Sequence, residues 1–107
     1  MLLRSTAISF ARFSSSQMLG MDLVITDHHL PGDRLPDCVA VVDPHRTDIS
    51  CPFKEYAGVG VAFKLACALE GDEQIIISDF ADLVAVGTVA DIVPLTGENR
   101  LLVKYGL

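Results

Sequence analysis

The chain has 107 residues, 50% of them hydrophobic, and its 14 acidic and 8 basic residues give a net charge of −6. This length allows one small domain with a core, while the acidity argues against an isolated nucleic-acid binder, because attraction to phosphates dominates that affinity. Three cysteines without Cys-x-x-Cys spacing argue against a disulfide framework or a cysteine zinc site, and no apolar run is long enough for a membrane span. We therefore expect a cytoplasmic protein with reduced thiols and no membrane partner.

The first 18 residues differ in composition from the rest. They contain Arg4, Arg12 and three consecutive serines but no acid, which is typical of a mitochondrial-type presequence. The alternative is an N-terminus without targeting function, produced by a wrong start site or a frame change. We divide the chain into this segment (1–18), either disordered or targeting, and a domain over 19–107. An organellar location is expected only if residues 1–17 are a real presequence.

Two short apolar runs predict buried β-strands. The first covers residues 21–26 and leads directly into Asp27, and the second covers 38–42 and leads into Asp43. Because each run is followed by a crossover, we expect an α/β fold with a mostly parallel sheet flanked by helices. In such sheets ligands bind at the carboxyl ends of the strands, so residues 27–29 and Asp43 lie where a site is expected.

The second half of the chain predicts helices. Residues 57–70 have a helical period and are followed by Gly71, which suits a C-terminal cap. The apolar stripe of this helix is expected to consist of Val61, Leu65, Ala68 and Leu69. A second helix is expected from about Ser78, its N-cap, until Pro94 stops it, and a third opens within 98–107.

The sequence Asp27-His28-His29 is the first candidate for chemistry. Imidazole and carboxylate groups both bind metal ions. Because adjacent side chains leave a strand on opposite faces, we expect a divided role, with one histidine ligating a metal and the other facing a substrate. From the triplet alone, a solvated polar turn is an equally good interpretation.

Asp91 is the second candidate. It follows a long apolar stretch, where an acid is either half-buried or needs a partner. The alternative is a surface acid in the last turn of a helix, although an acid near a helix C-terminus opposes the macrodipole, a conflict that a cation would resolve.

Small residues in 57–63 (AGVGVAF) allow a close approach of the backbone. Helix–sheet packing is favoured over a phosphate-binding loop, because neither Gly-x-Gly-x-x-Gly nor a P-loop Lys-Ser pair is found. The other polar residues of the central loops are interpreted as loop residues without function; they are Asp33, Asp37, Asp43, His45, Arg46 and Asp48.

Three segments together resemble the DHH phosphoesterase superfamily and, within it, the RecJ-type single-strand-specific DNA exonucleases. They are LGMDLVITDHHLPGDRLPDCVAVVDPHR at 19–46, PFKEYAGVGVAFKLACAL at 52–69 and DLVAVGTVADIVPLTGENRLLVKYGL at 82–107. The triplet alone would be a weak signal, but the ordered set of motifs is specific.

The resemblance implies a two-metal phosphodiesterase that uses Mn²⁺ or Mg²⁺ and degrades single-stranded DNA from its 5′ end in repair and recombination. His28 and Asp91 match family residues that ligate one metal ion. His29 matches the histidine that faces the scissile phosphate, and Asp27 matches an aspartate with a supporting role in catalysis. Bound cations would also provide the positive charge that an acidic chain lacks.

The sequence also departs from the family pattern. The family has an Asp-x-Asp motif and a bridging aspartate upstream of the triplet, whereas the 26 residues before Asp27 contain one acid, Asp22. The family's further domains are not found after Leu107 either. We therefore expect a partial domain, a fragment of a 5′–3′ exonuclease that is inactive alone, with single-stranded DNA as the partner of the intact protein. The alternatives are another DHH phosphoesterase acting on oligonucleotides or cyclic dinucleotides, and a non-catalytic remnant. The sequence predicts no oligomeric state.

Overall fold

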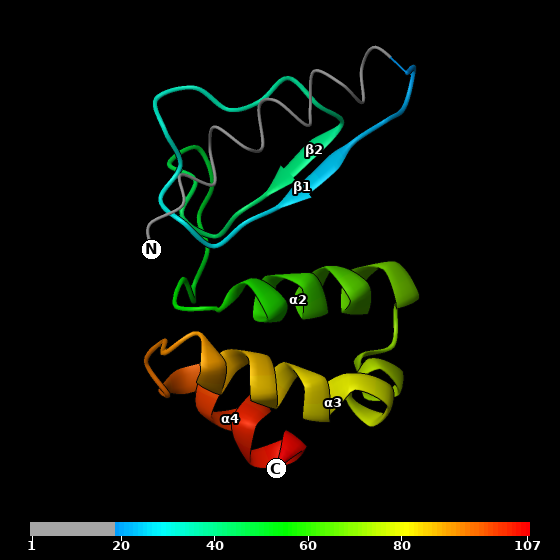
Figure 1. Cartoon of the computed structure of the whole chain (residues 1–107), viewed down its shortest axis with the longest axis vertical. Helices are drawn as coiled ribbons and strands as arrows, with labels where there is room; N and C mark the ends of the chain where they lie inside the picture. Colours follow the sequence, from blue (N-terminus) through cyan, green and yellow to red (C-terminus); the bar gives the residue numbers. More distant parts are fainter. Residues whose placement is uncertain (1–18) are drawn as a thin grey trace.

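A computed structural model describes residues 19–107, and the predictions for residues 1–18 lie outside this range. Strands β1 (Val24–Thr26) and β2 (Ala40–Val42) precede helices α2 (Gly58–Glu70), α3 (Glu73–Ala90) and α4 (Gly97–Gly106). The strands pair in parallel, with Val24 beside Ala40 and Thr26 beside Val42. Figure 1 shows the helices stacked on one side of this strand pair. The small parallel sheet with its helices confirms the predicted α/β class.

The two strands are shorter and more exposed than predicted. β1 begins at Val24, where the apolar run begins at residue 21, and the Val24 side chain is half exposed. Within the described residues each strand is paired along one edge only, so a large part of its surface remains in contact with solvent.

The first predicted helix is confirmed, but its apolar stripe is partly wrong. α2 ends at Glu70, and its C-cap Gly71 adopts a left-handed conformation (φ 79°) and donates its N–H to the Cys67 carbonyl. The buried residues gather in the first half of the helix, where Val61 and Phe63 meet the core, while Leu69 is exposed. The last residues of α2, 68–70, therefore extend beyond the part that packs against its neighbours.

Both predicted ends of the second helix are wrong. α3 begins at Glu73, because the side chain of Asp72 caps it by accepting a hydrogen bond from the Gln74 N–H. Ser78 therefore lies inside the helix. The helix ends at Ala90 with Asp91 as its C-cap, and Ile92 follows with a positive φ of 54°, before Pro94 is reached.

The core lies among the three helices. Its buried apolar side chains are Tyr56, Val61, Phe63, Ile76, Val84 and Leu102. Asn99 of α4 is fully buried, and its amide donates hydrogen bonds to the carbonyls of Glu55 and Pro94, 2.6 and 3.0 Å away. α4 is thereby tied to the loops before α2 and after α3. Across residues 19–107, the helices are too short or too polar to cross a membrane.

Candidate metal-binding site at the end of strand β1

The predicted triplet begins where β1 ends. The Asp27 N–H donates to the Val42 carbonyl (3.0 Å), which continues the strand ladder for one residue. The chain then turns, because Asp27 Oδ1 accepts hydrogen bonds from the backbone N–H groups of His28 (2.7 Å) and His29 (3.1 Å). Aspartate commonly stabilises turns in this way. The same side chain that ends the strand therefore fixes the two histidines.

This turn brings the two imidazole rings together. Their centroids are 4.2 Å apart, and potential ligand atoms of Asp27, His28 and His29 all lie within 4.8 Å of one another. The expectation that the histidines point to opposite faces is wrong, because it assumed that the strand continued through them. The side chains still differ in exposure, at 19% for His28 and 58% for His29.

Asp27 also orients the His29 ring. Its Oδ1 lies 2.6 Å from His29 Nδ1. Burial alone would raise the pKa of Asp27, but the hydrogen bonds from the His29 backbone, the His29 ring and the His28 backbone outweigh it, and the pKa lies below its ordinary value. An ionised carboxylate only accepts hydrogen bonds, so His29 Nδ1 is the donor in this contact and Nε2 is left for another partner.

Asp91 lies beside His28, although the two residues are far apart in the sequence. His28 Nε2 and Asp91 Oδ2 are 3.4 Å apart. Asp91 reaches this place because it caps α3, with its N–H donating to the Gly87 carbonyl. Neighbouring ligand atoms around an octahedral ion with bonds of about 2.1 Å lie about 3 Å apart. One nitrogen and one carboxylate oxygen at this spacing therefore fit a single divalent cation.

A pocket of about 380 Å³ opens at this pair. Helices α2 and α3 contribute its other walls, which consist of Ala57, Gly58, Val59, Gly87 and Ala90. A Cβ built on Gly58 would lie 3.5 Å from Cδ2 of His28, so the first turn of α2 lies close to the imidazole. The small residues of 57–63 were expected to pack on the sheet. They also line the site, and Gly87 gave no sequence signal beyond being a glycine inside a helix.

Asp43, which the sequence placed at a strand end and which was alternatively interpreted as a loop residue without function, is buried at 4% exposure. Its Oδ1 accepts the His45 N–H at 2.9 Å. It also lines a small pocket of about 50 Å³ together with Asp27 and Arg34. The ends of both strands therefore carry a carboxylate, as the sequence predicted for the strand ends.

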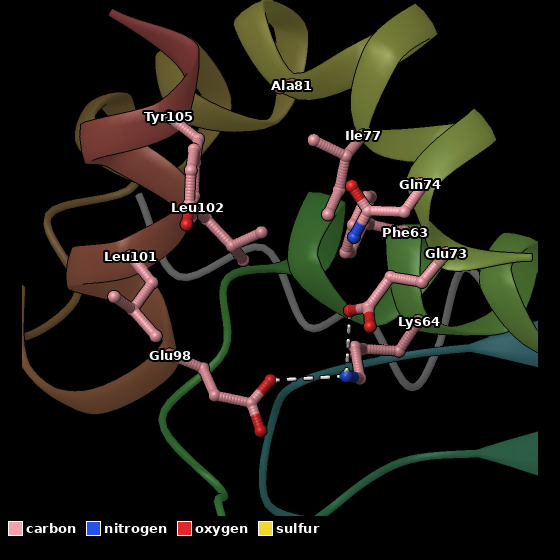
Figure 2. A pocket seen from close by; sticks show the side chains of 10 residues that line it. All are labelled: Phe63, Lys64, Glu73, Gln74, Ile77, Ala81, Glu98, Leu101, Leu102 and Tyr105. Carbon is pink, nitrogen blue, oxygen red and sulfur yellow. Dashed lines mark ion pairs between the residues drawn. The ribbon is translucent and has the colours of Figure 1, made fainter.

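A larger pocket, about 460 Å³, lies between α2, α3 and α4 and contains none of the predicted site residues. Figure 2 shows the Lys64 ammonium between the carboxylates of Glu98 and Glu73, at 3.3 and 3.7 Å. Glu98 also accepts a hydrogen bond from the Tyr56 hydroxyl. Lys64, Glu73 and Glu98 come from α2, α3 and α4, so the cluster links the three helices.

A family model described as "DHH family, N-terminal domain" matches residues 5–88, a range that contains Asp27, His28 and His29 and ends before Asp91. The range begins inside the first 18 residues, and the division at residue 18 stays a prediction. No solved structure matches the chain.

Three curated relatives carry the name single-stranded-DNA-specific exonuclease RecJ. The Bacillus subtilis protein is 55% identical over 89 residues, which is 83% of this chain and 11% of the relative. The proteins of Salmonella typhimurium and Escherichia coli are 45% and 43% identical over 111 aligned residues, covering 92% of this chain and 19% of each relative. The chain thus spans between about a tenth and a fifth of the length of these relatives.

Proposed function

The chain belongs to the DHH family, and from this membership we propose that it forms the Asp-His-His part of a metal-dependent exonuclease that hydrolyses phosphodiester bonds of single-stranded DNA. One observation carries the proposal: His28 Nε2 lies 3.4 Å from Asp91 Oδ2 at the strand end. The substrate follows from the names of the relatives. A 5′–3′ direction, a role in repair and recombination, and a cytoplasmic location belong to the same proposal.

In this proposal His28 and Asp91 hold a divalent cation, Mn²⁺ or Mg²⁺. The imidazole ligand favours the softer Mn²⁺, whereas the carboxylate suits either ion. When bound, the cation stabilises negative charge on the phosphodiester and lowers the pKa of an attacking water. His28 suits the ligand role because its ring is largely buried and its Nε2 faces the carboxylate.

In this proposal His29 contacts the substrate, and Asp27 orients the His29 ring. The Asp27 carboxylate holds the His29 Nδ1 proton, so the ring cannot rotate freely. The His29 side chain is 58% exposed, and its Nε2 is available to exchange a proton or a hydrogen bond with a phosphate oxygen. Asp27 then acts through His29, and its removal weakens catalysis more than it weakens metal binding.

A chimera tests the proposed function, with the matching 89 residues of the Bacillus subtilis relative replaced by those of this chain. We expect the chimera to degrade 5′-labelled single-stranded DNA when Mn²⁺ or Mg²⁺ is present and to leave duplex DNA intact. His28→Ala and Asp91→Ala in the chimera should abolish this activity, while Lys64→Met, a change in the larger pocket, should not.

Other results of this experiment would contradict the proposal. A folded chimera that cleaves dinucleotides or cyclic dinucleotides in preference to long single strands would indicate another DHH phosphoesterase. A folded chimera without any hydrolysis would indicate a non-catalytic remnant. Activity that persists in His28→Ala and Asp91→Ala would show that these residues do not form the metal site.

A further inference from the structure

Helices α2 and α3 approach each other very closely at one point, Val59 against Gly87. A Cβ built on Gly87 would lie 2.7 Å from Cγ1 and 3.1 Å from Cβ of Val59. The first distance is shorter than real Cβ contacts, so a side chain at position 87 would require a shift of the Val59 side chain or of one helix. Glycine is unfavourable inside a helix relative to alanine, and a packing reason for its presence is therefore expected.

The two residues of this contact are neighbours of the two proposed ligands. Val59 follows Gly58, where an added Cβ would come within 3.5 Å of the His28 ring. Gly87 lies one helical turn before Asp91 and accepts the Asp91 N–H at 3.1 Å. All of these residues line the same pocket. The distance between α2 and α3 at this point is therefore the distance between two walls of the pocket that contains His28 and Asp91.

We propose that Gly87 is a positioning residue whose contact with Val59 sets the separation at which His28 and Asp91 bind one divalent cation. The inference rests on the proposed metal-dependent function. The inference goes beyond the proposed function by assigning a role to a residue that touches neither metal nor substrate. A Cβ at position 87 would force α3 away from α2 and carry Asp91 away from His28.

Four variants of the full chain test this role, with Mn²⁺ binding measured by calorimetry and folding followed by circular dichroism. Gly87→Ala should weaken Mn²⁺ binding about tenfold, in the range observed when groups that orient a metal ligand are changed. The double variant, which combines Gly87→Ala with Val59→Ala, loses the clashing methyl groups of Val59. It should regain the Mn²⁺ affinity of the unmodified chain. Val59→Ile, which adds a methyl group at the contact, should weaken binding less than Gly87→Ala does.

Gly106→Ala is the matched steric control. Its Cβ would lie 2.0 Å from the Ala81 carbonyl oxygen and 2.5 Å from the Ala85 Cβ, so it crowds α3 against α4 at a distance from the proposed ligands. We expect lower stability and unchanged Mn²⁺ affinity of the folded protein. If crowding at Gly106 weakens Mn²⁺ binding as much as crowding at Gly87, the effect is one of general stability, and the positioning role is wrong.

A metal-free measurement separates this inference from the proposed function. The distance between His28 and Asp91 in the metal-free chain, determined by NMR, should increase in Gly87→Ala and return in the double variant. An unchanged distance in Gly87→Ala, or an increase that Val59→Ala does not reverse, overturns the inference. If the unmodified chain binds no Mn²⁺ but the distance follows this pattern, the metal site fails while the positioning role of Gly87 stands.

Discussion

The pocket between α2, α3 and α4 joins three helices through charged side chains, whereas the strand-end site joins the end of β1 to the end of α3, and the two differ in what they can bind. Between the helices, the Lys64 ammonium contacts two carboxylates, and one of these also accepts the Tyr56 hydroxyl. At the strand end, a carboxylate faces an imidazole, which is a metal ligand in its neutral form. In the larger pocket the Lys64 ammonium already contacts the carboxylates. In the smaller pocket an imidazole nitrogen and a carboxylate oxygen lie close enough to bind one cation.

This comparison shows that neither pocket size nor the presence of an ion pair identifies a cation site. An ammonium group competes with a metal ion for its carboxylates, because it occupies the same oxygen atoms with a charge of the same sign. An imidazole instead offers a lone pair once its proton is lost. The type of nitrogen beside the carboxylate decides between the two roles.

The largest expected effect is on metal affinity. His28→Ala or Asp91→Ala should weaken Mn²⁺ binding by more than about 100-fold, above the range for residues that only orient a ligand. Lys64→Met keeps the apolar stem and should leave the Mn²⁺ dissociation constant within about twofold. Calorimetric titration of the three variants measures this directly. Equal losses in all three would remove the distinction between the two pockets.

Sequence reasoning located the strand-end residues but not their geometry. The end of α2 was predictable, because a left-handed glycine terminates a helix through local contacts. The start of α3 was not, since Asp72 and Ser78 are both acceptable N-caps and packing decides between them. The rotation of the two histidines into one turn depends on hydrogen bonds to Asp27 that a strand pattern does not contain.

The partnership of His28 with Asp91 had no local signal either. Asp91 was a candidate because it is an acid that follows a long apolar stretch. The family resemblance then implied the role of a metal ligand. The closeness of Gly87 to Val59 depends on how two helices pack, so no residue spacing within one helix reveals it. Local rules therefore predicted the kinds of element and the end of α2, but neither the ends of α3 nor the contacts between elements.

The second expected effect is on stability and concerns the helical region. Asn99→Ala removes the amide that donates to the carbonyls of Glu55 and Pro94 and leaves a fully buried space. We expect a loss of about 2–3 kcal/mol in the free energy of unfolding, because buried acceptors are left without donors. Urea unfolding measures the loss. The Mn²⁺ affinity of the folded fraction should stay unchanged, and a parallel loss of affinity would contradict the separation of the two regions.

The third effect is a loss of stability at high pH. Burial and the neighbouring Glu98 raise the pKa of Tyr56 above its ordinary value of 10.0. Burial lowers the pKa of Lys64, but Glu98 and Glu73 outweigh it and leave the pKa above 10.5. In both cases the folded state keeps its proton where the unfolded state loses it, so this stabilisation is complete below about pH 10 and declines as the pH rises further.

Urea unfolding between pH 8 and pH 11 measures this decline. Tyr56→Phe should flatten the dependence, because the phenol that gives up its proton in the unfolded state is then absent. His28→Ala should leave the slope unchanged, since the strand-end site lies outside this network. The same slope in Tyr56→Phe and in the unmodified chain would show that the network does not control stability at high pH.

The smallest effect is expected at Thr88 of α3, whose hydroxyl is buried and has no hydrogen-bond partner among the described residues. A buried hydroxyl without a partner costs free energy, and valine has the same shape and a similar helix propensity. Thr88→Val should therefore raise the free energy of unfolding by up to about 1 kcal/mol. The same change at the exposed Thr47 should shift it by less than about 0.5 kcal/mol. If Thr88→Val instead lowers stability by more than the Thr47 control, the hydroxyl makes a contact that stabilises the helical region, and α3 is held by polar as well as apolar groups at this point.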